Sequence, residues 1–197
     1  MTQQNTININ YQGFQIAVQL APYRELTLSD DEKEKAAAQA AAAPESQVEQ
    51  TKTYMLQSAL VAKVAAASVF RVPKTLAHER ALAMGRALEQ KLETDQLTLD
   101  GYLEAMKTTK DALISDFEVQ AKQQLRQRIC LLAIAKAEGL EATDEEYAVE
   151  LERLSSGYMV TQEELVGLFA TSGEDNAVRE DITISKAASL MMKLAGA

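Results

Sequence analysis

Alternating apolar and polar residues flank a Gln-Gly pair at residues 12 and 13, near the start of the chain. This period of two predicts a pair of strands joined by a two-residue turn. In that register all the apolar side chains share one face, because successive side chains of a strand point to opposite sides. A hairpin of two strands is marginally stable alone, so we expect this face to dock on the rest of the protein or to pair with a second copy. The face consists of Ile7, Ile9, Tyr11, Phe14, Ile16 and Val18.

Beyond the hairpin the apolar residues recur at every third or fourth position, which predicts a succession of helices. One stripe lies within residues 56–67 and a second within residues 113–129, and Gly139 is placed to end the second helix. The stripes consist of Leu56, Leu60, Val64, Ala67, Leu113, Phe117, Ala121, Leu125 and Ile129. A last helix is expected over residues 175–194, with Val178, Ile182, Ser185 or Lys186, and Ser189 or Leu190 along one side.

Helix starts are predicted where Ser or Thr precedes Asp or Glu by three residues, because each side chain of such a pair accepts from the other's backbone N–H. The pairs are Ser29–Glu32, Ser46–Glu49, Thr108–Asp111, Thr143–Glu146 and Thr161–Glu164. Pro73 suits a first helical turn, and Thr98 is expected to start a short helix. The predicted helices are very unequal in length and show no repeat of fixed period.

The segment from Ser29 to Pro44 is rich in alanine and has little apolar bulk. Helix propensity rather than packing would hold such a helix, and Pro44 is expected to stop it. A spacer helix and an exposed, fraying linker both fit this composition. We therefore divide the chain into a hairpin with an alanine-rich linker, residues 1–44, and a helical domain, residues 45–197.

Composition indicates a soluble protein that can bury a core. Of the 197 residues 47% are hydrophobic, and the net charge of −9 argues against nucleic acid or an anionic membrane as the main partner. No stretch has the pattern of a signal peptide or of a membrane-spanning segment. The single cysteine, Cys130, cannot form an internal disulfide, which fits a reducing compartment. The expected location is the cytoplasm.

Signatures of catalysis and of metal binding are absent from the sequence. His78 is the only histidine and is expected on a helix surface, since the residues after it lack the second histidine of a zinc-protease helix. The apolar run around Cys130 favours a small core residue over a reactive thiolate. Acidic clusters at residues 29–35 and 143–146 suit helix N-termini. We predict no enzyme activity, no metal and no cofactor.

Several segments resemble, in the same order, the C-terminal domain of trigger factor, the bacterial ribosome-associated chaperone. They are "RVPKTLAHERA", "LTLDGYLEAMKTTKDALISDFEVQAKQQLRQRI", "ICLLAIAKAEGLEATDEEYAVELERL" and "VREDITISKAASLMMKLA". This order holds over roughly residues 45–195 and is more specific than any one motif. Upstream, "YQGFQIAVQLAPYRELTLSDDE" resembles the linker of the same family.

The resemblance implies a mainly α, extended multi-helix fold: the helical body of trigger factor, which has a spine of long helices with two arms and is similar in fold to the periplasmic chaperone SurA. In the family the concave, partly apolar surface of this body holds unfolded chains. In the family an FKBP-type isomerase module follows the linker helix, and an N-terminal domain docks on the ribosome. Here "AAAQAAAAPESQ" leads directly into the long helix. We therefore expect neither isomerase activity nor ribosome docking.

The predicted function is ATP-independent, chaperone-like binding of unfolded or nascent polypeptides. The alternative is a non-enzymatic scaffold that binds one folded partner, or itself as a homodimer. Methionine suits surfaces that accept many partners, although a methionine at helical spacing also fills cores. The side chains expected to touch clients lie near helix ends or on short helices: Met84, Leu88, Tyr102, Met106, Tyr158, Met159 and Phe169.

Overall fold

The structure is a computed structural model that describes residues 6–172 and 174–196. Its elements are, in chain order, β1 (Thr6–Tyr11), β2 (Phe14–Gln19), α1 (Asp30–Ala40), the 3₁₀ turn η1 (Glu45–Gln47), α2 (Val48–Ala67), α3 (Lys74–Thr94), α4 (Leu99–Met106), α5 (Lys110–Glu138), α6 (Asp144–Tyr158), α7 (Gln162–Ser172) and α8 (Glu174–Ala195). A mainly α fold with an N-terminal β-hairpin is therefore confirmed.

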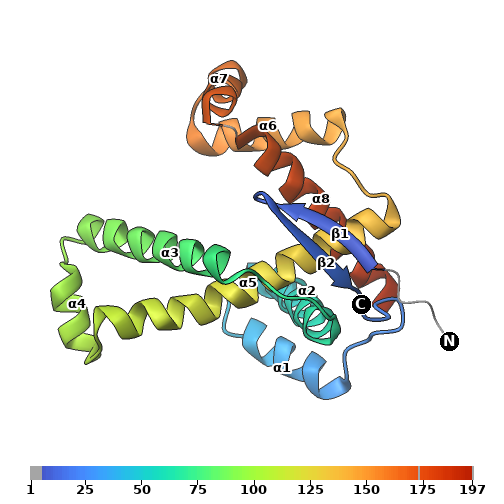
Figure 1. Cartoon of the computed structure of the whole chain (residues 1–197), viewed down its shortest axis with the longest axis horizontal. Helices are drawn as coiled ribbons and strands as arrows, with labels where there is room; N and C mark the ends of the chain where they lie inside the picture. The colour runs from blue at the N-terminus through green and yellow to red at the C-terminus, as the bar shows by residue number, and fades with distance from the viewer. Residues whose placement is uncertain (1–5, 173, 197) are drawn as a thin grey trace.

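Two arms project from a central body (Figure 1). The long arm, residues 74–121, consists of α3 and the first part of α5, which run antiparallel, and α4 lies across their far end. The second arm, residues 141–181, consists of α6, α7 and the first part of α8. α5 continues from the long arm into the body, where it contacts α2, α8 and β1. This one helix therefore connects the long arm to the core.

Small side chains let the helices of the body approach closely. The core shared by α2, α5 and α8 contains Leu60, Val64, Ile134 and Met191, all almost fully buried. Four alanines belong to the same cluster: Ala65, Ala135, Ala187 and Ala188. Because alanine ends at Cβ, these positions bring the helix backbones near one another.

Among the helices that the structure describes, none is both long and apolar enough to cross a membrane.

The hairpin has the predicted register. Tyr11 pairs with Phe14, and the ladder continues outward from that pair with Ile9 opposite Ile16 and Ile7 opposite Val18, so that these large apolar side chains share one face. Gln12 and Gly13 have φ values of 47° and 83°, the left-handed conformation that a two-residue turn of this type requires at both positions. Four side chains of the face are buried in one cluster with Val72, Leu76, Leu125 and Ile129; they are Ile9, Tyr11, Ile16 and Val18. The hairpin thus docks on the helical body, with Ile7 and Phe14 half-buried at the margin.

The segment after α2 joins the hairpin to the helices. Val69 exchanges two backbone hydrogen bonds with Gln19 of β2, at 3.0 and 2.8 Å. Ser68 is buried, and its hydroxyl accepts from the N–H of Ala21 while donating to the carbonyl of Val64. The segment therefore ties the end of β2 to the end of α2.

Arg126 of α5 binds the same segment through its main-chain carbonyls. Its guanidinium donates to the carbonyl oxygens of Ala65, Ser68 and Phe70 and lies over the Phe70 ring, 4.5 Å from the ring centre. The last carbonyls of a helix have no partner within the helix. Arg126 supplies that partner at the end of α2.

Most helix starts agree with the sequence pattern. Capping boxes begin α1 at Ser29, α6 at Thr143 and α7 at Thr161, and Thr98 caps α4 by accepting from Gly101 N–H at 3.2 Å. Pro73 stands immediately before α3.

Two predicted starts are wrong. Ser46 lies inside η1, where Gln47 N–H donates to Pro44 O at 2.7 Å, so its side chain has no helix start to cap and α2 begins at Val48. The cap of α5 is Thr109 and not Thr108: the Thr109 hydroxyl accepts from the N–H of Ala112. The N–H of Thr108 instead donates to a carbonyl at the end of α4, so this residue belongs to the preceding helix end.

Among the helix ends that the structure describes in full, four share a motif in which an N–H donates to the carbonyl five residues earlier. It closes α3, α4, α5 and α6 around a residue with positive φ: Gln96, Lys107, Gly139 and Met159. Only Gly139 tolerates this conformation without steric cost, which is why it alone could be predicted to end a helix. The reversals at Gln96 and Lys107 place α4 across the end of the long arm.

Packing differs from expectation at three places. α1 is neither a free spacer nor a fraying linker, because it packs on α2 with Ala36 and Ala40 buried. Ala67 is exposed, and the buried position near the end of α2 belongs to Ser68. The side of α8 that enters the core carries Ala187, Ala188 and Met191, whereas Ser185 and Ser189 are exposed.

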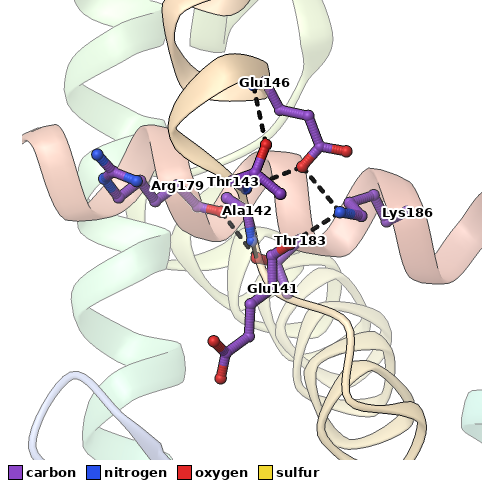
Figure 2. Close-up of polar contacts among 7 residues, drawn as sticks. All are labelled: Glu141, Ala142, Thr143, Glu146, Arg179, Thr183 and Lys186. Carbon is purple, nitrogen blue, oxygen red and sulfur yellow. Dashed lines mark hydrogen bonds and ion pairs between the residues drawn. The ribbon is translucent and has the colours of Figure 1, made fainter.

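A polar junction fixes the second arm to the body (Figure 2). Lys186 of α8 donates to Glu141 O and to the Glu146 carboxylate, both at 2.8 Å, while Thr183 accepts from the N–H of Ala142 at 3.2 Å. Glu146 also closes the capping box by accepting from the N–H of Thr143. The Lys186 contact and this N–H lower the pKa of Glu146 below its ordinary value. The same carboxylate therefore starts α6 and anchors it to α8.

Replacing Arg126 with methionine is expected to lower the free energy of unfolding by about 2–3 kcal/mol, because three partly buried carbonyls lose a charged donor. Urea unfolding followed by circular dichroism measures this loss. Arg71→Met is the matched control: Arg71 is exposed in the neighbouring segment, and its replacement is expected to change stability by no more than about 0.5 kcal/mol. Equal losses in the two variants would contradict the role given to Arg126.

Lys186→Met is expected to speed hydrogen exchange of the amides at residues 142–147 about threefold to fivefold, a modest effect because the ion pair is partly exposed. Lys193→Met, an exposed change on the same helix, should leave these rates unchanged. Because the folded pKa of Glu146 is lowered, its contribution to stability is complete above the ordinary glutamate pKa of about 4.3 and is lost as the pH falls through the folded value. The effect of Lys186→Met should shrink accordingly in acid; a constant effect would show that the contact does not depend on the charge of Glu146.

Candidate functional site

His78 and Cys130 carry the side chains best suited to catalysis, and the surroundings of both favour a structural role. His78 Nδ1 lies 2.5 Å from a carboxylate oxygen of Glu118, so this pair joins α3 to α5 in the long arm. Cys130 is buried, and burial raises the pKa of its thiol to about 11, which disfavours the nucleophilic thiolate. Within residues 6–172 and 174–196 no group of His, Cys, Asp and Glu side chains is arranged to hold a metal ion. Exposed apolar side chains at the arm ends are the features that could bind a partner.

Apolar side chains are exposed at the end of the long arm. Leu97, in the turn before α4, is 55% exposed, and Met106, in the last turn of α4, is 60% exposed. Leu97 and the small residues Gly101 and Ala105 line a hollow of about 390 Å³, together with the half-buried Tyr102. The end of this arm can thus receive an apolar side chain of another molecule.

The end of α6 presents a second apolar surface. Tyr158 is 68% exposed and Met159 is 94% exposed. Met159 also has a φ of 56°, a left-handed conformation that costs a residue with a side chain roughly 1–2 kcal/mol. Further exposed apolar side chains on this arm are Val149, Val166 and Leu168.

The residues predicted to touch clients fall into three groups. Met106, Tyr158 and Met159 are exposed at the arm ends. The side chains of Met84, Leu88 and Tyr102 are half-buried. Phe169 is a correction: it is only 8% exposed, because it packs with Leu151 and Leu165 in the small core between α6 and α7. It supports the second arm and does not face solvent.

Sequence reasoning missed other exposed apolar residues, among them Leu97 and Val149. Leu97 directly precedes the cap residue Thr98, a position outside both neighbouring helices, and this could have marked it as exposed. Val149 lies between Glu145 and Glu152 on one face of α6, since these positions are four and three residues apart. An apolar residue on an acidic face is a detectable signal of exposure.

Several hollows lie where the arms meet the body, among them two that α8 lines together with other helices. A groove of about 470 Å³ lies between α6 and α8, with Val149 and Ile182 as its apolar part and Glu145 at its edge. A cleft of about 660 Å³ is lined by the hairpin, α3, α5 and α8. Arg128 lines that cleft and is held by the carboxylates of Glu180 and Asp181, at 2.6 and 2.7 Å.

Comparison with known proteins gives one consistent result. The family model described as the bacterial trigger factor protein C-terminus matches residues 30–193. The trigger factor of Halalkalibacterium halodurans is 27% identical over 134 residues, covering 68% of this chain and 31% of the relative. That of Carboxydothermus hydrogenoformans is 31% identical over 134 residues, covering 66% and 31%. That of Streptococcus pneumoniae serotype 4 is 27% identical over 165 residues, covering 84% and 37%.

These alignments are partial for the relatives. The chain spans about a third of the length of the trigger factors that it matches. No solved structure matches it. The family match nevertheless covers most of the chain, from α1 through nearly all of α8, and it agrees with the two-armed helical fold. The chain therefore belongs to the family of the trigger factor C-terminus.

Proposed function

We propose that this chain binds unfolded or partly folded polypeptides as an ATP-independent, chaperone-like protein. The observation that carries the proposal is the exposure of apolar side chains at the ends of both arms, in a member of the trigger factor C-terminal family. The proposal concerns only the part of the relatives that this chain matches, about a third of their length. It therefore assigns neither ribosome docking nor isomerase activity.

The distribution of these side chains suits a flexible partner. An unfolded chain loses conformational entropy on binding, so its contacts are individually weak and must be numerous. Leu97 and Met106 at one end, and Tyr158 and Met159 at another, offer separate small patches instead of one deep pocket. A chain that wraps between the arms can touch both patches at once, which raises its apparent affinity.

The proposal predicts suppression of client aggregation at near-stoichiometric amounts, with no effect of added ATP, measured by light scattering of an unfolding client protein. Leu97→Ser/Met106→Ser and Tyr158→Ser/Met159→Ser should each raise the concentration needed for half suppression about threefold to tenfold, because each removes apolar area that a client would cover.

The control is Tyr54→Ser/Val119→Ser, which removes two similarly exposed apolar side chains from α2 and from the middle of α5. This variant should suppress aggregation as well as the unchanged protein does. Equal weakening by all three variants would show that the arm ends have no special role. Failure of the unchanged protein with several unrelated clients would refute chaperone-like binding, and a dimer that persists when clients are added would favour a scaffold.

A further inference from the structure

The outer edge of β1 carries main-chain groups that the hairpin does not use. In an antiparallel ladder, opposite residues alternate between pairs that exchange two main-chain hydrogen bonds and pairs that exchange none. The pair that flanks the two-residue turn, Tyr11 and Phe14, is of the bonded kind, and so is the pair that Ile9 makes two positions further on. Asn8 and Asn10 therefore direct their N–H and C=O groups away from β2, along the opposite edge.

Two observed contacts agree with this alternation. Gln19 of β2 exchanges both of its main-chain hydrogen bonds with Val69, on the side of the hairpin away from β1. On the edge of β1, the carbonyl of Asn8 accepts from Lys136 Nζ at 2.9 Å. Within the part of the chain that the structure describes, no group accepts from the N–H of Asn8 or of Asn10. This edge therefore has donors that another extended chain can use.

The features that commonly protect a sheet edge are missing from β1. Natural edge strands carry charged residues, proline or a bulge, which keep other strands from pairing with them. The strand TININY has no charged residue and no proline, and it pairs with β2 without a bulge. The one charged contact at Asn8 comes from Lys136 of α5, whose side chain is exposed and can move aside.

A hollow of about 410 Å³ continues from this edge of the sheet. It lies between β1, the last turns of α5, the segment that follows α5, and α8. In a strand added to β1, the side chains opposite Ile7 and Ile9 share the face of these two residues, which is the face toward the helices. Alternate side chains of such a strand can thus enter the hollow, whose apolar lining consists of Ile9, Leu132, Ala135 and Leu140.

We propose that β1 receives a segment of unfolded polypeptide as a third strand of the sheet. The segment pairs through its main chain with Thr6, Asn8 and Asn10, and it places alternate apolar side chains in the hollow between β1, α5 and α8. This rests on the proposed function and adds to it a second site with a different mode of recognition. Main-chain hydrogen bonds give affinity there, and the hollow selects an alternating apolar pattern.

The surroundings of the edge favour a single extended chain over β1 of a second copy. Helices α5 and α8 form other sides of the hollow, so a copy would have to bring its own helices against them. Charge opposes a copy as well. Residues 141–181 contain twelve carboxylates and two arginines, a net charge of −10, and Glu141 and Glu180 of this stretch line the hollow. Two copies edge to edge would bring these like charges together.

The experiment compares three short labelled peptides of alternating threonine and valine, by fluorescence anisotropy on the full chain. One peptide is unmodified, one has N-methyl groups on its threonines, and one has them on its valines. An N-methyl group removes a donor, and in a paired strand only alternate residues direct their N–H groups to β1. One methylated peptide should therefore bind about tenfold more weakly than the unmodified peptide, and the other should stay within about twofold. Equal losses, or no loss in either, would overturn strand addition.

Variants then locate the edge. Asn8→Pro removes an outward N–H at a position where an edge strand tolerates proline, and it should weaken the unmodified peptide about fivefold. Ala17→Pro is the matched control, because Ala17 lies opposite Asn8 and directs its N–H to the other edge of the hairpin; it should change the affinity less than about twofold.

Lys136→Met removes the side chain that competes for the Asn8 carbonyl, and it should strengthen binding about twofold to threefold. Circular dichroism checks that each variant is folded. If a proline variant does not fold, the methylated peptides and Lys136→Met still decide the question, since a weaker or unchanged affinity of Lys136→Met would contradict the role given to the Asn8 carbonyl.

The outcomes separate this site from the function on which it rests. If no peptide binds while client aggregation is still suppressed, the strand site is overturned and the proposed function stands. Loss of both activities would refute both. Equal weakening by Asn8→Pro and Ala17→Pro would show a general response to a distorted hairpin and would overturn the site. Leu97→Ser/Met106→Ser should leave the peptide affinity unchanged, because the end of the long arm lies far from β1 (Figure 1). Self-association that Asn8→Pro abolishes, without peptide binding, would overturn the proposal and assign the edge to a second copy.

Discussion

The architecture depends on satisfying the main-chain groups where α2 ends. A buried carbonyl without a partner is costly, and three carbonyls in this region accept from the single guanidinium of Arg126. The same segment pairs with β2 through Val69 and holds Ala21 through Ser68. Hairpin, α2, α3 and α5 therefore meet at one place, and the direction in which α3 departs into the long arm is set there.

The body and the arms use apolar area in different ways. In the body, alanines bring α2, α5 and α8 together, so a modest amount of apolar bulk forms a continuous core. At the arms, larger side chains such as Leu97 and Met159 face solvent. The second arm is held at its base by polar contacts, with Lys186 as their centre, so its orientation is defined while Val149 of α6 stays exposed.

Local chemistry in the sequence predicts local structure well here. The hairpin register follows from one alternation, and Ser29, Thr143 and Thr161 begin helices because each residue's side chain and backbone suffice to define the cap. Helix ends at Gln96, Lys107 and Met159 could not be predicted, because nothing in these residue types favours a left-handed conformation. There the tertiary fold imposes what the local sequence opposes.

Exposure is the property that sequence pattern predicts least. Phe169 and Met159 are both large apolar residues close to helix ends, yet one is buried and the other is almost entirely in solvent. The difference comes from the way α7 folds back on α6, which encloses Phe169 with Leu151. Helical period identifies a face, but only the neighbouring element decides whether that face is covered.

The docking of the hairpin has a consequence for how the protein folds while it is being synthesised. Its apolar face is complete once Val18 has been synthesised, but the residues that cover it extend to Ala133 of α5. At translation rates of about 5–20 residues per second, that interval lasts roughly 6–23 s. During this time the part of its cover that α5 supplies is missing, and the contacts with α5 are among the most distant along the chain, which slows their formation further. A protein of a chaperone family thus passes through a stage of its own synthesis in which it resembles a client.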